Sequence, residues 1–191
     1  LRKIETSDER ARQLQQELSG LLAEAASRAE KLSAARGDAA GRFTARVMEE
    51  LAFLDMPSVT LTVRRQEKPL SGDGIDELEL YISTNVGEEP RSLAKIASGG
   101  ELARIMLSVK NVMAGRDDIG TLIFDEVDTG VSGRAAQKIG HKLRQVAADR
   151  QVIVVTHLAQ VAAHAQHHLL ISKTARGDRT FTSIIPLEGE D

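Results

Sequence analysis

Residues 121–133 read TLIFDEVDTGVSG, and this stretch decides the fold of the chain. Its first four residues follow Gly120 as a short apolar run, which is typical of a strand buried on both faces of a parallel sheet. The acids Asp125, Glu126 and Asp128 come directly afterwards. Because ligands bind beyond the carboxyl ends of the strands in open α/β sheets, the sequence predicts a ligand site here.

The adjacent pair of Asp125 and Glu126 suits a definite chemistry. A carboxylate such as Asp125 can hold a hydrated Mg²⁺ ion, and Glu126 can take a proton from an attacking water molecule. The alternative is a strand that simply ends in a solvated acidic turn, and the pair taken alone favours that alternative. Two neighbouring features of the sequence favour the chemical interpretation.

The first of these features is the tetrapeptide SGGE at residues 98–101, which opens a stretch of apolar residues at helical spacing. Gly99 and Gly100 allow the backbone to approach a ligand without a Cβ clash. Ser98 is placed as a capping hydroxyl, and the free N–H groups of the first helical turn favour an anion. A plain serine-capped helix is the alternative.

The second feature is His157, which follows the apolar, β-branched run QVIVVT at residues 151–156. A histidine at the ligand edge of a strand can donate to a phosphate group or to an attacking water molecule. A histidine with a purely structural role is the alternative.

The N-terminal part of the chain predicts a coiled-coil arm. Residues 1–36 contain no proline and one glycine, and their apolar residues follow a heptad: Ile4, Ala11, Leu14, Leu18, Leu21, Ala25, Leu32 and Ala35. An ordinary amphipathic helix is the alternative. The chain has no second heptad run of equal length, so we expect the partner helix to lie outside it. Gly37 and Asp38 predict a break before a second helix over residues 39–54.

The remaining elements define an α/β fold class. Alternating residues predict strands at 59–63 and 78–82, separated by a polar loop over 64–75. From Ser98 onward the predicted order is helix, strand, helix, strand, helix, strand, and a final strand follows at 180–187. This alternation indicates a parallel sheet with flanking helices.

Composition excludes several classes of protein. The chain has 191 residues and no cysteine, so disulfide frameworks, cysteine zinc sites and thiol catalysis are excluded. Its net charge of −3 restricts any nucleic-acid contact to a local patch, and its four Phe and one Tyr make a base-stacking platform unfavourable. No stretch has the length and apolarity of a membrane span, and no secretory signal is expected. We expect a cytoplasmic protein that does not bind membranes.

Three segments together carry a resemblance to a known family. The segments IASGGELARIMLSVK, TLIFDEVDTGVSG and VIVVTHLAQVAAHA resemble, in this order, the C-terminal half of the head of ABC-type P-loop ATPases of the SMC class. Within that class they are similar to the bacterial SMC-like proteins of DNA double-strand-break repair. The resemblance implies ATP and Mg²⁺ as cofactors, DNA as a partner, and a location at the bacterial nucleoid.

The resemblance also implies a role for each motif residue. Glu126 looks like the general base, His157 like the switch histidine, and Asp125 like the Walker B ligand that holds Mg²⁺ through water. The signature loop of the family reaches the γ-phosphate of ATP held by the opposite head. In this chain the residues that resemble it are Ser98, Gly99, Gly100 and Glu101. The D-loop is similar to the stretch with Asp128, Gly130 and Ser132. The class usually ends its D-loop in an aspartate, whereas residues 130–133 here read GVSG, which puts cross-talk between two sites through this loop in doubt.

A Walker A loop, G-x-x-x-x-G-K-[ST], is absent, because the chain contains no Gly-Lys dipeptide. We therefore expect residues 1–36 to be the stub of a coiled-coil arm and residues 37–191 to be the C-terminal half of an ATPase head. The resemblance implies that such a chain is inactive alone. It also implies that the chain needs the N-terminal P-loop half of the same protein and pairs with a second head as a homodimer. A DNA-binding or head-dimerisation module without catalysis of its own is the alternative.

Two further groups of residues are weaker candidates. One helix face carries Arg134, Lys138, His141 and Lys142, which could meet DNA phosphates or form a solvated surface. The group of His164, His167 and His168 lacks an acid or cysteine that would complete a metal site.

Overall fold

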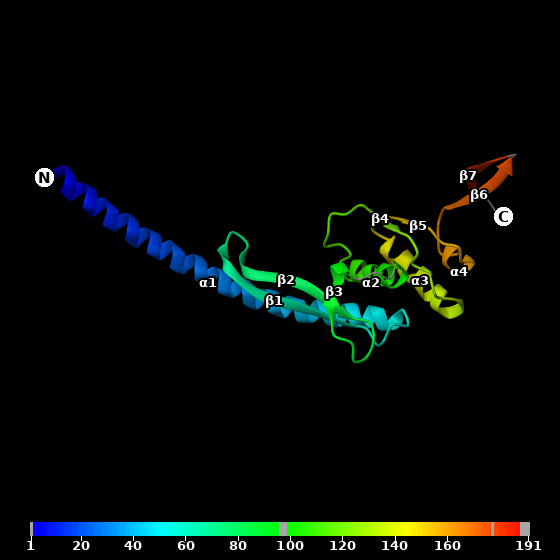
Figure 1. Cartoon of the computed structure of the whole chain (residues 1–191), viewed down its shortest axis with the longest axis horizontal. Coiled ribbons are helices and arrows are strands. Elements are labelled where there is room, and N and C mark those ends of the chain that lie inside the picture. Colours follow the sequence, from blue (N-terminus) through cyan, green and yellow to red (C-terminus); the bar gives the residue numbers. More distant parts are fainter. Residues whose placement is uncertain (1, 96–98, 177, 188–191) are drawn as a thin grey trace. The chain divides into compact units, whose positions relative to one another are not determined.

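A computed structural model describes residues 2–95, 99–176 and 178–187 (Figure 1). The chain divides into two compact units. The first unit comprises Leu1–Arg46 and Thr60–Ala94, and the second comprises Val47–Val59 and Lys95–Asp191. We describe each unit by itself. The functional boundary predicted between residues 36 and 37 stays a prediction.

Helix α1 (Arg2–Phe53) is continuous, so the break predicted at Gly37 and Asp38 is wrong. One glycine costs a helix only about 1 kcal/mol relative to alanine, and the alanines on both sides are strong helix formers. The helix ends where Asp55 adopts a left-handed conformation with φ 61° and the Met56 N–H donates to the Leu51 carbonyl at 2.9 Å. Pro57 then prevents continuation.

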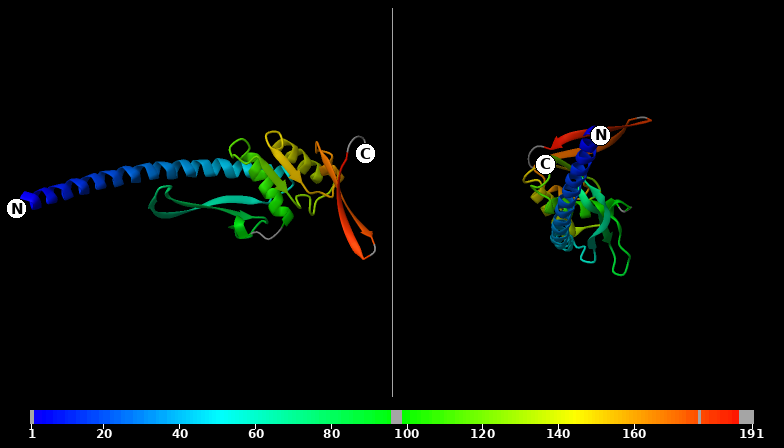
Figure 2. Two further views of the ribbon diagram at one scale, coloured as in Figure 1. Left: turned by 90° about the horizontal axis from the view of Figure 1, so that it is seen from above. Right: turned by 90° about the vertical axis from the view of Figure 1, so that its left-hand side faces the viewer.

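Strands β1 (Thr60–Ser71) and β2 (Gly74–Ser83) form a long antiparallel hairpin that runs along α1 within the first unit (Figure 1 and Figure 2). The short β3 (Arg91–Ser92) pairs with β2. The polar loop predicted over residues 64–75 is therefore wrong, because most of it is strand. Its residues are polar since much of this ribbon faces solvent.

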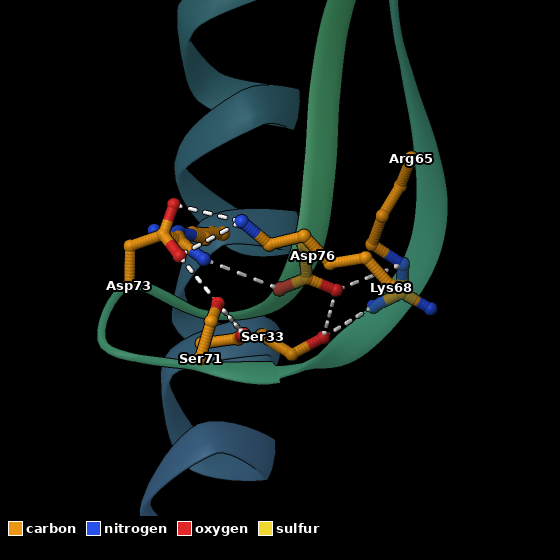
Figure 3. A network of polar contacts seen from close by, with 8 residues as sticks. Ser33, Arg65, Lys68, Ser71, Asp73 and Asp76 are labelled. Carbon is orange, nitrogen blue, oxygen red and sulfur yellow. Dashed lines mark hydrogen bonds and ion pairs between the residues drawn. The ribbon is translucent and has the colours of Figure 1, made fainter.

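A buried polar network joins the hairpin to α1 (Figure 3). Ser33 of α1 donates to Asp76 Oδ1 at 2.9 Å and accepts from Arg65 Nη1 at 2.7 Å. Arg36 Nη1 lies 3.6 Å from Asp76 Oδ2, and the Asp76 carboxylate is buried. Near the hairpin turn, the exposed Asp73 accepts from Lys68.

The second unit contains the motif-bearing elements. The 3₁₀ helix η1 (Leu93–Lys95) spans the point in the sequence where the first unit ends and the second resumes. The second unit then continues with α2 (Gly99–Val112), β4 (Thr121–Phe124), α3 (Gly133–Val146), β5 (Gln151–Val154) and α4 (Ala159–Ala162). Strands β4 and β5 pair in parallel, from Thr121 opposite Gln151 to Phe124 opposite Val154. The predicted α/β class with a parallel sheet and helices is confirmed.

The last two strands differ from the prediction. Strands β6 (His168–Arg176) and β7 (Arg179–Leu187) pair with each other as an antiparallel hairpin. Within the described residues this hairpin is a separate sheet and adds no strand to the parallel pair. The alternation of helix and strand thus breaks down after α4, where the short turn between β6 and β7 leaves no room for a crossover.

The core of the second unit covers one face of the β4–β5 pair. Leu122 and Phe124 point into it. They pack with residues of α2, α3 and α4, with the residue that follows α1, and with the loop after β4: Leu54, Leu107, Val127, Ala136, Ile139, Leu143, Val146 and Val161. Ile123, on the opposite face of β4, is 70% exposed. The expectation that this strand is buried on both faces is therefore wrong for this chain, because its helices cover one face only.

Candidate active site

The loop that follows β4 carries the two adjacent carboxylates, and both side chains are exposed. The Glu126 backbone N–H donates to Asp125 Oδ1 at 2.9 Å. Glu126 has a φ of 56°, in the left-handed region that costs a residue with a Cβ about 1–2 kcal/mol. The Thr129 N–H then donates to the Glu126 carbonyl at 3.0 Å, which closes a tight turn over residues 126–129.

The N-terminus of α2 lies against this turn. A Cβ atom at Gly99 would collide with Oε2 of Glu126, and one at Gly100 would lie 3.0 Å from the Thr129 carbonyl oxygen. Both positions therefore require glycine, because the turn over residues 126–129 of the same chain leaves no room for a side chain. Glu101 lies in the first turn of α2, where a negative charge is favoured. Ser98 lies outside the described residues, so its predicted role stays a prediction.

Arg104 holds the same turn from one helical turn further along α2. Its guanidinium Nη1 donates to the Thr129 carbonyl at 2.9 Å and lies 3.4 Å from the Val127 carbonyl. Burial lowers the pKa of Arg104, and the nearby Glu101 offsets this in part. Sequence reasoning missed this residue. No apolar pattern marks it, because the neighbouring buried positions along this side of α2 are Gly100 and Ser108, which carry no apolar side chain.

Asp128 joins the ends of β4 and β5. Its side chain is buried, at 2% exposure, and Oδ2 accepts from the Thr156 hydroxyl and from the His157 backbone N–H at 3.2 Å. Burial raises the pKa of Asp128, but these two donors, the backbone N–H of Asp128 itself and the charge of His157 together lower the pKa overall. The imidazole Nδ1 of His157 lies 3.4 Å from the same oxygen, and its side chain is 72% exposed.

The structure thus brings most of the predicted site residues to one edge of the parallel strands. Gly99 meets Glu126, Asp125 binds the backbone of Glu126, and Asp128 binds the backbone of His157. Gly130 has a φ of 76°, and Ser132 precedes α3 without a side-chain capping bond. Beside this edge, a cavity of about 340 Å³ between α2 and β4 extends from Gly99 to Asp125 along apolar side chains.

The four basic residues predicted to share one face of α3 are not all exposed to solvent. Lys142 is buried, and its Nζ lies 2.6 Å from Glu50 Oε2. Lys138 Nζ lies 2.6 Å from Asp55 Oδ1, and both ammonium groups lie over the ring of Phe53. Two of the four candidate DNA-contacting groups therefore bind the end of α1. Arg134 and His141 remain exposed, and their contact with DNA stays a prediction.

Neither a metal cluster nor a membrane span is found in the part of the chain that the structure describes. There, no three His, Cys, Asp or Glu side chains group as they would around a metal ion. Within the same residues, no helix combines the length and the apolarity that crossing a membrane requires. His164 packs against α3, where a Cβ atom at Gly140 would collide with its ring.

Comparison with solved structures defines the class of protein. An Smc head domain with a coiled coil and joint from Pyrococcus yayanosii is 20% identical, with a TM-score of 0.54 over 76% of this chain and 26% of that one. The SmcHead bound to the C-winged helix domain of ScpA gives a TM-score of 0.50 at 20% identity, over 76% of this chain and 43% of that one. The matched part of the chain therefore has the fold of an SMC-type head. No protein-family model matches the chain.

Curated relatives narrow this class. The chain is 45% identical to the DNA repair protein RecN of Streptomyces coelicolor over 188 residues, which are 92% of this chain and 33% of the relative. It is 40% identical to RecN of Halalkalibacterium halodurans over 189 residues, 96% of this chain and 34% of the relative. The chain spans about a third of the length of the relatives it matches. The predicted resemblance to bacterial SMC-like repair proteins is confirmed, and within them the chain is RecN-like.

Proposed function

We propose that this chain is the signature and Walker B half of an ATPase head that hydrolyses ATP in the repair of DNA double-strand breaks. The observation that carries the proposal is the convergence of three distant stretches of sequence. Glu126 lies against Gly99, and Asp128 binds the backbone of His157. A general base, an anion-binding helix end and a proton donor are the groups that phosphoryl transfer to water needs.

The donor set at Asp125 fits Mg²⁺. Its carboxylate is exposed at the strand end, and the Glu126 N–H donates to Oδ1, so Oδ2 is the oxygen that we assign to a hydrated ion. Mg²⁺ commonly binds through one or two carboxylates together with water and substrate phosphates, which agrees with a site that has no cage of protein ligands. When bound, the ion would neutralise charge on the phosphates.

Each of the other site residues of this chain has its own role in the proposed reaction. Glu126 accepts the proton of the attacking water, and His157, steadied through Asp128, donates a hydrogen bond to the γ-phosphate. Gly99, Gly100 and Glu101, with Ser98, face the nucleotide of a second head, so two heads sandwich two ATP molecules as a homodimer. The predicted arm stub over residues 1–36 and head half over residues 37–191 are part of this proposal, as is action in the cytoplasm at the nucleoid.

The exposed apolar surface supports the N-terminal P-loop half as the missing partner. Ile123, Ile153 and Val155 form an uncovered face on the β4–β5 pair. Strands β6 and β7 expose further apolar side chains: Leu169, Leu170, Ile171, Phe181, Ile184, Ile185 and Leu187. Apolar area of this kind marks an interaction surface. About two thirds of each relative lies outside the matched part, which is ample for the partner half.

Reconstitution tests the proposal. The chain alone should not bind Mg-ATP in calorimetry, whereas a mixture with its P-loop half should hydrolyse ATP. Glu126→Gln keeps the size of the side chain and removes the base, so turnover should fall by about 10²–10⁴-fold while ATP still binds. Glu88→Gln, in the first unit, is the matched control and should hydrolyse at the parent rate. Parent-like turnover by Glu126→Gln would remove Glu126 from its role.

A further inference from the structure

We propose that Arg104 is a positioning residue for hydrolysis, which fixes the turn that carries Glu126 and Asp128 to the first turns of α2. The inference rests on the proposed function of the site. It assigns the signature helix a task inside its own head, in addition to the nucleotide of the opposite head.

The turn over residues 126–129 is held by α2 at two places. Gly100 packs against the carbonyl groups of Thr129 and Glu126. A Cβ atom added to Gly100 would lie 3.0 Å from the Thr129 oxygen and 3.2 Å from the Glu126 oxygen. Arg104 Nη1 hydrogen-bonds the Thr129 carbonyl at 2.9 Å. These contacts flank Val127 and Asp128, so the helix defines both the start and the end of the turn.

The chemical environment of Arg104 indicates that the guanidinium serves the turn. Its side chain is 8% exposed, and no carboxylate of the described residues forms an ion pair with it. Its Nε finds no hydrogen-bond partner there either. Glu101 is a nearby opposite charge, but the hydrogen bonds of this buried cation go to the Val127 and Thr129 carbonyls. An apolar side chain of similar size would avoid the cost of burying the charge. What the guanidinium provides, and an apolar side chain would not, is the pair of hydrogen bonds to the carbonyls of the turn.

Because Arg104 restrains the turn over residues 126–129, it also restrains Glu126 and, through Asp128, His157. Glu126 sits in a left-handed backbone conformation, which persists only where the surroundings hold it. Asp128 is fixed between the two carbonyls that face Arg104, and it binds the backbone N–H of His157. A displacement of α2 would therefore shift the base and the switch histidine together.

The experiment uses the complete protein, with this chain joined to its P-loop half. Arg104→Met fills the space without a donor, and Arg104→Lys keeps the charge with a shorter reach to the turn. Arg116→Met, at an exposed arginine, controls for loss of charge. Ile139→Val, in the core, controls for loss of stability. The measurements are kcat and KM for ATP, the melting temperature, and hydrogen exchange of the Thr129 amide, which bonds the Glu126 carbonyl.

We expect Arg104→Met to lower kcat by about 100-fold, the size of effect that a displacement of about 1 Å produces, with KM for ATP unchanged. Arg104→Lys should recover part of that loss, and the Thr129 amide should exchange faster in both variants. If Arg104→Met fails to fold, a lowered kcat in Arg104→Lys decides for the proposal. Values of kcat within twofold of Ile139→Val in the folded variants would overturn it. A parent without turnover would overturn the proposed function and this inference with it.

Discussion

At the scale of single residues, Asp128 joins the two strand ends that carry the proposed general base and the proposed switch histidine. Its folded-state pKa lies below its ordinary value, so the carboxylate contributes stability above about pH 4 and loses it as pH falls through the folded-state pKa. The Thr156 hydroxyl is one of the donors that lower this pKa. Removing the hydroxyl should therefore change stability and its pH dependence together.

We expect Thr156→Val to destabilise the protein by about 1.5–3 kcal/mol at pH 7, the value of a hydrogen bond to a charged group. The deficit should shrink below pH 4, because a protonated Asp128 depends less on the lost donor. Urea unfolding at pH 7 and pH 3 measures this. Thr156→Ser retains the hydroxyl and should keep most of the stability at both values. An equal deficit at the two pH values would contradict the assigned role of Asp128.

Sequence reasoning placed the proposed site residues at the ends of the strands and missed the residues that hold them there. Asp125 and Glu126 come at the end of the run TLIF, and His157 comes at the end of the run QVIVVT, so their place at the strand ends was predictable. Arg104 and Thr156 act through a backbone carbonyl and a single carboxylate oxygen, contacts that leave no periodic signal. Asp128 was predicted in the D-loop, but its contact with His157 depends on the pairing of β4 with β5.

At the scale of elements, the β1–β2 hairpin shows where pattern reading fails. Residues 64–75 are mainly polar because a ribbon with much of its surface in water needs no apolar alternation, so the sequence resembles a loop. The position of the hairpin on α1 depends on the buried Asp76, which faces Ser33, Arg36 and Arg65 (Figure 3). No local pattern distinguishes this aspartate from Asp73 in the same hairpin.

The two aspartates should therefore respond differently to the same substitution. Asp76→Asn removes a buried charge from two arginines and should cost on the order of 3 kcal/mol, as breaking a buried ion pair does. Hydrogen exchange of the β1 and β2 amides should accelerate. Asp73 is exposed, and its hydrogen bond with Lys68 lowers its pKa to about 2. Asp73→Asn should leave exchange near the parent level, and comparable effects of both variants would refute the network as the anchor of the hairpin.

The interaction of Asp73 with Lys68 has its own pH signature. Since the folded-state pKa of Asp73 is depressed, this interaction is complete above about pH 4 and is lost as pH falls towards 2.

At the scale of the whole molecule, the parallel strands match the sequence prediction in pairing but not in burial. The continuous apolar run of β4 predicts cover on both faces, whereas α2, α3 and α4 cover one face and leave Ile123 at 70% exposure. A fully apolar strand is physically consistent if a polypeptide outside this chain covers the second face.

Docking of the P-loop half on this face gives the last prediction. Ile123→Asp puts a charge at the centre of the exposed face of β4 and leaves the buried Leu122 and Phe124 untouched. We expect the dissociation constant for the P-loop half to rise about 30-fold or more, which corresponds to about 2 kcal/mol at an interface centre. The melting temperature of the chain should stay close to that of the parent. Val86→Asp, at a side chain that is 90% exposed in the first unit, is the matched control. Equal affinity of both variants in calorimetry would show that the P-loop half docks elsewhere.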